Sequence, residues 1–195
     1  MDLSPSTPSK KELSHQRIVE VASRAIRRAG YDGVGVADIM KEAGLTHGGF
    51  YAHFDSRAAL LAEALGHAGR ASGASFAEHV QARRAAGETA LRVVIETYLS
   101  EAHRVGAELG CPVAALSSEM PRQAPALQEA GAERVRALVA TVRQALDGET
   151  ADDDAQVIAA TMVGALQLAR VLGPESGGEL LAATRASLLA RYERS

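Results

Sequence analysis

The sequence predicts an all-α protein, and three observations lead to that prediction. Of its 195 residues, 47% are hydrophobic but only 4% are aromatic, and alanine, leucine, glutamate and arginine, which favour helices, are abundant. The apolar residues recur at spacings of three and four, the period of an amphipathic helix. No segment shows the alternation that a strand would need. A chain of this length can build one or two units with a hydrophobic core.

Apolar stripes predict four helices in the first part of the chain. They cover about residues 12–29, 36–43 and 46–52, and a fourth begins after Ser56. The segment 71–87 is rich in small residues and weakly periodic, so it is interpreted as the end of the fourth helix and a connector. These four helices would make one small domain.

The most informative segment of this domain is a tight helix-turn-helix. Ile39 and Ala43 lie four apart on one helical face, and Gly44 stands where a helix ends in a left-handed conformation. Leu45 fills the corner, and Thr46 can cap a new helix. Two short helices therefore cross over a small core, and the second helix of such a pair is usually inserted into DNA.

The sequence around this turn resembles a known family. The run from Val36 to Leu61, VADIMKEAGLTHGGFYAHFDSRAALL, is similar to the DNA-binding signature of TetR/AcrR-type transcriptional repressors, and the match extends from about Arg17 to Leu65. It fixes apolar, glycine, aromatic and basic positions together, so it is more specific than a bare helix-turn-helix pattern. The resemblance implies a homodimeric, all-helical repressor with a divergent ligand-binding domain behind the DNA-binding one.

We therefore predict three segments: a flexible leader over residues 1–11, a helix-turn-helix DNA-binding domain over 12–70, and an effector-binding and dimerisation domain over 71–195. The predicted function is that of a repressor released from a two-fold-symmetric operator by a small-molecule effector. Two alternatives stay open. One is a helical small-molecule-binding or enzymatic protein that has lost DNA binding, and the other is a cysteine-based electrophile or redox sensor of the same fold.

The second helix of the turn supplies the main candidates for DNA contact. Its first turn exposes backbone N–H groups, and the Thr46 hydroxyl lies beside them, so a phosphate can bind there, although Thr46 could also be an ordinary cap. His47 lies where side chains reach base edges, or it is a solvated histidine. The resemblance implies that Tyr51 donates to the DNA backbone; the alternative is a buried ring. Phe50 and Phe54, four apart, are assigned to the core.

This chain departs from the family pattern at two places. Gly48 and Gly49 follow His47, where a polar residue, a glycine and a small residue are frequent, and each glycine costs a helix about 0.5–1 kcal/mol relative to alanine. Such a helix could bring its backbone close to DNA while reading few bases. Arg57 stands where the family commonly has lysine, which keeps a charge for phosphate. The predicted DNA-binding residues are Lys10, Lys11, Thr46, His47, Gly48, Gly49, Tyr51, His53 and Arg57.

Two of these assignments have evenly weighted alternatives. Lys10 and Lys11 would follow the phosphate backbone or belong to a solvated tail, and His53 is either a backbone contact or a boundary residue. The net charge of the chain is −3, but residues 1–70 carry nine lysines and arginines against eight acidic residues. The small asymmetry has the sign that DNA binding needs, and dimerisation would double the cations on one face.

Further helices are predicted in the second part, over about residues 91–105, 127–146, 152–172 and 175–192, with a short one that begins at Pro112. Short, broken helices in a bundle often surround a cavity, so we expect an effector pocket among the middle helices. Its predicted lining is Tyr98, His103, Cys111, Ser117, Glu119, Met120, Met162 and Gln167. Any of them could instead be a core or surface residue. Cys111, at a helix N-terminus, could be a reactive thiol or a small buried residue.

The last two helices are expected to form the dimer, as is usual in the family. Their small residues permit close helix approach. The predicted interface residues are Ala160, Gly164, Ala165, Leu168, Leu181 and Leu188.

Several functions find no support in the sequence. There is no Walker loop, no nucleophile elbow, and no metal-binding motif, so we expect neither catalysis nor a metal or cofactor. The aspartates at 152–154 lack the spacing of a calcium loop. No charge-free stretch of eighteen residues and no signal peptide are present, and the single cysteine suits a reducing compartment. We therefore predict a cytoplasmic protein.

Overall fold

The computed structural model describes residues 8–146 and 152–193, and within these ranges the protein is all-α, as predicted, with no strand. In chain order the elements are α1 Lys10–Ala29, α2 Val36–Glu42, the 3₁₀ helix η1 His47–Ala52, α3 Arg57–Ala85, α4 Ala90–Tyr98, α5 Glu101–Val105, α6 Pro112–Leu116, the 3₁₀ helix η2 Met120–Arg122, α7 Pro125–Ala145, α8 Asp152–Leu172 and α9 Pro174–Tyr192.

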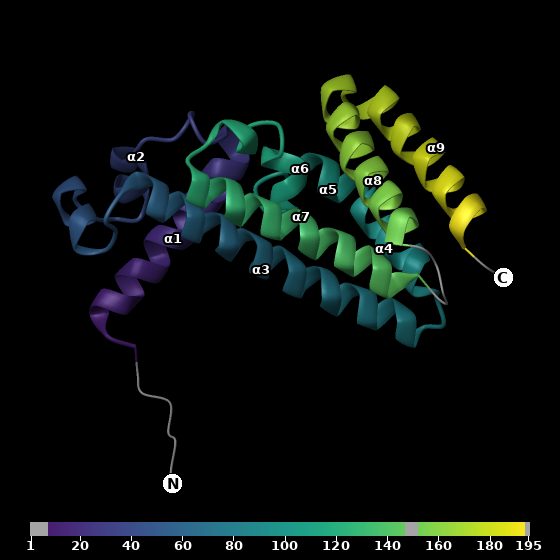
Figure 1. Cartoon of the computed structure of the whole chain (residues 1–195), viewed down its shortest axis with the longest axis horizontal. Helices are drawn as coiled ribbons and strands as arrows, with labels where there is room; N and C mark the ends of the chain where they lie inside the picture. The colour runs from purple at the N-terminus through teal and green to yellow at the C-terminus, as the bar shows by residue number, and fades with distance from the viewer. Residues whose placement is uncertain (1–7, 147–151, 194–195) are drawn as a thin grey trace, which may run out of the picture.

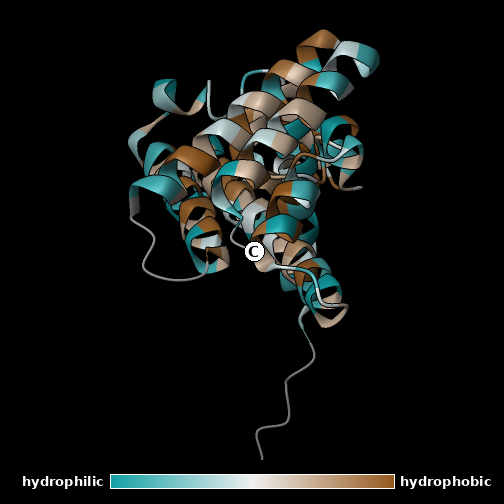
Figure 2. Ribbon diagram, turned by 90° about the vertical axis from the view of Figure 1, so that its right-hand side faces the viewer, coloured by the Kyte–Doolittle hydropathy of each residue, from teal (hydrophilic) through white to brown (hydrophobic). Residues whose placement is uncertain are grey.

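The helices form an elongated molecule (Figure 1). α1, α2, η1 and the start of α3 gather at one end, and α3 runs from there beside α7 along the long axis. α8 and α9 pack against each other at the opposite end, where Figure 2 shows apolar segments on the helices that face the viewer. The two ends of the molecule are thus joined by the long helices α3 and α7.

The first helix begins earlier than predicted because of a capping box. The Ser9 hydroxyl accepts from the Glu12 backbone N–H at 3.2 Å, and the Glu12 carboxylate accepts from the Ser9 N–H at 2.7 Å. Lys10 and Lys11 therefore lie in the first turn of α1 and not in a leader. The prediction that these two lysines precede the helix was wrong.

The turn between α2 and η1 follows the prediction, but the helix after it does not. Gly44 has φ +74°, and the Leu45 N–H donates to the Met40 carbonyl at 2.8 Å. The next element is a 3₁₀ helix in which the Gly49 N–H donates to the Thr46 carbonyl at 3.0 Å. In a capped helix the Thr46 hydroxyl would accept a hydrogen bond from this same Gly49 N–H, which the 3₁₀ bond already uses. Thr46 is therefore at the N-cap position without a side-chain cap, contrary to the prediction.

The fourth helix is much longer than predicted, because α3 continues through the segment interpreted as a connector. Ser56 caps its start by accepting from the Ala59 N–H at 3.1 Å, and Gly87, with φ +93°, follows its end. Just before this segment α3 packs closely against α7: a Cβ on Gly69 would lie 2.4 Å from the Arg134 side chain. The predicted domain boundary at residue 70 lies inside this helix.

The predicted helix over 91–105 is divided into α4 and α5. Ser100 starts the second piece, because its hydroxyl accepts from the His103 N–H at 3.1 Å. The Leu99 carbonyl, released at the break, accepts from Arg185 on α9 at 2.5 Å. Helices α6, α7, α8 and α9 lie where the sequence predicted them, and α7 ends at Ala145, one residue before the predicted limit.

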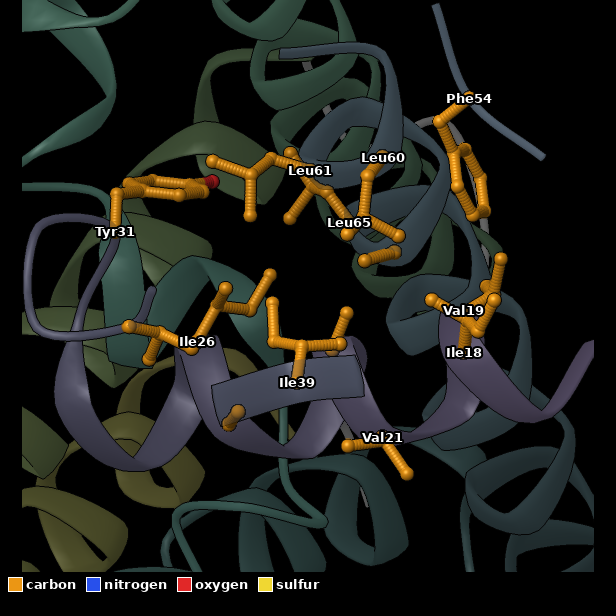
Figure 3. Packing of buried hydrophobic residues seen from close by; sticks show 14 of the residues in the cluster. Ile18, Val19, Val21, Ile26, Tyr31, Ile39, Phe54, Leu60, Leu61 and Leu65 are labelled. Atoms are coloured by element: carbon orange, nitrogen blue, oxygen red, sulfur yellow. The ribbon is translucent and has the colours of Figure 1, made fainter. Parts of the chain in front are cut away.

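Two hydrophobic clusters make the core. Phe50 and Phe54 belong to the first, which confirms their assignment. Figure 3 shows Tyr31 pointing toward Leu61 within this cluster. Leu116, Met120 and Leu127 from the second part of the chain also pack there, so the DNA-binding end shares its core with the start of the second domain. The second cluster joins α4, α7, α8 and α9.

Candidate DNA-binding surface and effector region

The surface of the helix-turn-helix presents the residues that the sequence predicted. Thr46, His47 and Gly48 are exposed, and the Tyr51 side chain is 74% exposed. Phe50, packed in the core, makes a T-shaped contact with the Tyr51 ring, with centroids 5.1 Å apart. Tyr51 is therefore not a buried ring. Because Thr46 makes no cap, its hydroxyl is also available on this surface.

The glycine pair is not required by the protein's own packing. A Cβ on Gly48 would meet nothing within 4 Å, and one on Gly49 would only reach ordinary contact with Thr46 and Met40, at 3.7 and 3.8 Å. Neither glycine has a positive φ. A requirement for glycine at position 48 would therefore have to come from another molecule that approaches this face.

Replacing Gly48 with alanine tests that demand. We expect the free energy of unfolding to stay the same or rise by up to about 1 kcal/mol, since alanine has less freedom in the unfolded chain. If the backbone lies against a phosphate, operator affinity falls in the same variant. Urea unfolding and DNA titration measure the two quantities. Gly73→Ala, on an exposed part of α3 with equal space, is the matched control and should leave DNA affinity unchanged.

Arg57 does not project from the surface as expected for a phosphate ligand. It is half-buried, and its Nη2 donates to the Tyr31 carbonyl and, at 3.2 Å, to the Val34 carbonyl. The guanidinium thus holds the turn between α1 and α2. The prediction that Arg57 contacts DNA is not supported, because its position at the start of α3 faces that turn.

His53 is a boundary residue in this geometry. It is half-buried, and its Nδ1 has no hydrogen-bond partner among the described residues. Burial, together with the charges of His15 and Lys11, lowers the pKa of His53. His15, which the sequence analysis did not single out, stacks on Phe54 at 4.5 Å and pairs with Glu63 at 2.8 Å. Both histidines therefore help to close the core beneath η1.

Exposed cations flank the helix-turn-helix. Lys10 and Lys11 lie in the first turn of α1, and Lys41 is exposed near the end of α2. The Arg17 guanidinium lies 3.7 Å from where a Cβ on Gly44 would be, next to the turn. The sequence analysis missed Arg17 and Lys41. Both residues lie on the polar sides of amphipathic helices. Most surface cations do so, and this pattern alone does not distinguish a DNA contact.

The predicted effector-pocket residues do not form one site. Met162 is fully buried in the second core cluster, and Met120 packs in the first, 2.8 Å from where a Cβ on Gly131 would lie. Gln167 donates to the Ser117 hydroxyl at 3.0 Å, which links α8 to the end of α6. Tyr98, His103 and Cys111 do lie together. The two methionines are core residues, which is the alternative to a pocket position that any apolar residue in a helix has.

Glu119 connects the two domains through its carboxylate. Its carboxylate accepts from the Tyr31 N–H at 2.8 Å. Gly30 has φ +76°, which strains any other residue, and a Cβ there would also lie 2.5 Å from that carboxylate and push it away. The contact fixes the end of α1 against η2. The prediction of Glu119 as an effector ligand was therefore wrong, because this side chain is occupied by the protein's own backbone.

The Tyr98, His103 and Cys111 cluster is ordered by hydrogen bonds. His103 Nδ1 donates to the Tyr98 carbonyl at 2.7 Å, and Nε2 accepts from the Cys111 N–H at 3.0 Å. This arrangement needs a neutral imidazole, and burial lowers the pKa of His103 to about 4. The Tyr98 hydroxyl is buried, and burial together with the neighbouring Cys111 thiol raises its pKa well above 10.

His103 should make the fold sensitive to acid. Its pKa is about 6.5 in the unfolded chain and about 4 in the folded one, so the unfolded chain binds the proton more tightly. The stabilisation is present above pH 6.5 and is lost as the pH falls toward 4, a decrease of about 3 kcal/mol at 1.36 kcal/mol per pKa unit. Urea unfolding across this range measures it. His103→Asn should flatten the pH slope, while His79→Asn, at an exposed site, should not. An unchanged slope in His103→Asn would contradict the assignment.

Sequence reasoning missed two arginines, the buried Arg27 and the half-buried Arg170, that hold distant segments together. Arg170 on α8 donates to the carbonyls of His103, Arg104 and Ala114 at 2.9, 3.1 and 3.1 Å, and so ties α5 and α6 to α8. Arg27 on α1 donates from Nη1 to the Gly110 carbonyl at 2.9 Å. Their partners lie 56–67 and 83 residues away in sequence. No local pattern could have indicated these contacts.

The predicted dimer residues fall into two groups. Ala165, Leu181 and Leu188 are 1–7% exposed and pack in the protomer's own core between α8 and α9, so assigning them to a partner surface was wrong. Ala160, Gly164 and Leu168 are exposed. With Val157 and Val171 they make an apolar stripe along α8, which we call the α8 stripe. One helix has two apolar faces here, and the sequence did not tell which one the protomer uses.

The comparisons agree with this geometry. A helix-turn-helix with an exposed reading face, followed by a helical second domain, defines a DNA-binding transcriptional regulator. Residues 18–64 match the profile of bacterial regulatory proteins of the tetR family, and residues 88–185 match that of the LmrA/YxaF-like transcriptional regulator C-terminal domain. The chain belongs to the TetR family and is a ligand-responsive DNA-binding transcriptional regulator. No curated protein sequence matches it significantly.

Solved structures share the fold over nearly the whole chain. A TetR transcriptional regulator from Chloroflexus aurantiacus is 26% identical with a TM-score of 0.77, over 94% of this chain and 97% of that one. The reduced form of NemR from E. coli is 19% identical with a TM-score of 0.75, over 93% and 98%. AibR in complex with isovaleryl coenzyme A and operator DNA is 17% identical with a TM-score of 0.62, over 90% and 97%.

One helix has the length and composition of a membrane span. Residues 153–172 of α8 have a mean hydropathy of 1.5, and 39% of the tested window is buried inside the protein. Helix α8 is apolar on two faces. One face packs against α9, and the other is the α8 stripe. TetR-family regulators are soluble DNA-binding proteins, and a single helix of this kind does not indicate a membrane protein.

Proposed function

We propose that this regulator is a cytoplasmic repressor that binds a two-fold-symmetric operator as a homodimer and leaves it when a small molecule binds the second domain. The observation that carries the proposal is the exposed face of η1, where Thr46, His47 and Tyr51 project from a fully packed core. An aromatic side chain that is 74% exposed beside an uncapped helix start suits a surface that another molecule covers.

The side chains of this face divide into those that bind phosphates and one that reads a base. Thr46, Tyr51 and the N–H groups at the start of η1 bind phosphates, and Lys10, Lys11 and Arg17 add charge around them. His47 is the one long side chain at the start of η1, so it reads a base edge. This face grips the DNA backbone and reads few bases directly, so DNA shape contributes to the choice of site.

The dimer forms through the α8 stripe and the exposed face of α9. Gly164 has open space where a side chain would be, and Ala160, Leu168 and, on α9, the alanines at 182 and 186 are exposed. Small residues on both helices allow close packing around a two-fold axis. Two reading heads about 34–36 Å apart would then meet successive turns of the major groove.

The alternatives are less favoured. A protein that has lost DNA binding would not be expected to match the family's DNA-binding profile over residues 18–64. The family's activity is regulation, so we infer a binding protein and not an enzyme. That AibR is described in complex with an acyl coenzyme A and operator DNA supports the same combination of effector and DNA here.

A gel-shift assay with the DNA that flanks the gene tests the proposal. We expect one retarded complex at moderate salt, on a site with two-fold symmetry, and a shift that weakens as salt is raised. Absence of any symmetric site, with the protein folded, would refute the repressor function.

Two substitutions separate backbone contact from base reading. Tyr51→Phe removes only a hydroxyl and should weaken binding to all DNA sequences alike, by about 1–2 kcal/mol. His47→Ala should relax preference at one base pair in each half-site, by about 1–3 kcal/mol. Binding to a library of operator variants measures both effects. Tyr192→Phe, far from the reading head, is a control for Tyr51→Phe. A sequence-dependent effect of Tyr51→Phe would contradict its assignment to the backbone.

A further inference from the structure

Two arginines from opposite parts of the chain line one surface depression of about 360 Å³. Arg27 comes from α1, in the DNA-binding domain, and Arg170 comes from α8. The rest of the lining is mainly apolar: Ala107, Ala114, Ala115, Gln167, Leu168 and Val171. The depression thus lies where the two domains meet.

Both guanidinium groups are bonded only to neutral groups. Arg170 donates to three backbone carbonyls, as described above. Arg27 donates from Nε to the Ser23 carbonyl and from Nη2 to the Ser23 hydroxyl, both at 3.0 Å, and from Nη1 to the Gly110 carbonyl. A guanidinium has five N–H groups, so one on each terminal nitrogen of both side chains is not used by these bonds.

The two charges also lack acidic partners. In residues 8–146 and 152–193, no carboxylate lies within ion-pair distance of Arg27 or Arg170. Glu108, whose charge acts on Arg27, pairs with the neighbouring Arg28 at 3.4 Å. Burial lowers the pKa of both arginines, which is the sign that desolvation outweighs the nearby negative charge. Partly buried charges without a counter-ion are unfavourable, so an anion that reaches both would be stabilised.

We propose that this depression binds a carboxylate attached to a short apolar group, and that it is the effector site of the regulator; the second statement rests on the function proposed above. The planar guanidinium suits the two oxygens of a carboxylate. The alanines suit an apolar body, and Leu168 and Val171, which belong to the α8 stripe, border the depression on the side of the proposed dimer contact. The volume is at the small end of the range for ligand sites, about 300–1,000 Å³. The sequence-predicted pocket residues contribute only Gln167.

The position of the site gives it a route to the DNA-binding domain. An anion between Arg27 and Arg170 bridges α1 to α8, which carries the proposed dimer stripe. If the two conformations of the dimer differ in the distance between these helices, the ligand favours one of them by its differential affinity. Arg27 is thus the residue through which the ligand would act on the reading head.

Calorimetric titration of the full chain tests the site without DNA. The probes are octanoate and 3-phenylpropanoate, each compared with its uncharged amide. We expect both carboxylates to bind and the amides to bind at least about tenfold more weakly, since they lose a charge-assisted hydrogen-bonded pair. Failure of both carboxylates to bind, or equal binding of acid and amide, would overturn the proposal.

A matched pair of variants locates the binding. Ala107 is half-buried and lines the depression from the segment after α5, outside the α8 stripe, so changing it leaves the proposed dimer face intact. Ala107→Glu places a competing carboxylate beside the arginines and should weaken octanoate binding at least about tenfold, whereas the isosteric Ala107→Gln should bind octanoate far better than Ala107→Glu. Light scattering checks that both variants have the same oligomeric state. Equal octanoate affinity in the two would place the ligand elsewhere and refute the site.

Gel shifts on the same proteins separate this proposal from the repressor function. Carboxylate binding without any operator complex would leave the site standing and refute the function. An operator complex without carboxylate binding would refute the site and leave the repressor function standing.

Discussion

Gly164→Arg is expected to convert the proposed dimer into a folded monomer and to lower operator affinity by about a hundredfold or more. A dimer that holds two half-sites gains about 10²–10⁴ over a single head, and the monomer loses that gain. The arginine should be accommodated by the protomer, because Gly164 is exposed and a Cβ there meets nothing within 4 Å. Inside a close contact between two copies of α8, however, it would force the helices apart.

The substitution is informative because it should not destabilise the monomer. Arginine has a higher helix propensity than glycine by up to about 1 kcal/mol, so loss of DNA binding could not be attributed to unfolding. Gly73→Arg is the matched control: it also lies on a helix, is exposed, and has open space for a Cβ. Light scattering gives the mass, and DNA titration gives the affinity. A Gly164→Arg variant that remains dimeric would show that the interface is elsewhere.

Arg170→Met should cause the largest loss of stability, about 3–5 kcal/mol. The variant keeps an aliphatic side chain but removes the donor for the carbonyls of His103, Arg104 and Ala114. Bonds to a charged donor contribute about 1.5–3 kcal/mol each, and partly buried carbonyls without a partner are unfavourable. α5 and α6 would then be held to α8 mainly by apolar contacts.

Thermal and urea unfolding measure this effect. For a domain of this size, a loss of about 3–5 kcal/mol corresponds to a melting temperature lower by roughly 6–20 °C. Arg84→Met, which removes an exposed guanidinium near the end of α3, should change the melting temperature little. Arg170→Lys should recover only part of the stability, because an ammonium cannot reach three carbonyls with a planar fork. Wild-type stability in Arg170→Met would mean that water replaces the lost donors.

Local patterns in the sequence were sufficient for the helix-turn-helix. Gly44, Leu45 and the spacing of Phe50 and Phe54 each depend on neighbours a few residues away, so the turn and its core could be predicted. The same holds for α7, α8 and α9, whose apolar stripes are long. The capping box at Ser9 and Glu12 was equally local, and overlooking it placed Lys10 and Lys11 in a leader.

The errors concern helices whose limits depend on distant partners. The segment 71–85 has too few apolar residues to predict a helix, and it is helical because it lies against α7. Helix α8 has two apolar faces, and only its packing against α9 shows which one is internal. In the effector region, Glu119 was chosen for its chemistry, but the Tyr31 N–H, 88 residues away, occupies it.

The sequence by itself determined that this protein is a helical DNA-binding regulator of the TetR family, because the reading head is encoded within about fifty consecutive residues whose contacts are local. Only the tertiary structure decided what lies behind that head. Arg27, Glu119 and Arg170 have ordinary surroundings in the sequence, and their roles come from carbonyls, N–H groups and a shared depression supplied by segments far along the chain. Charge and hydrogen bonding depend on distances in space, and a single sequence does not contain those distances.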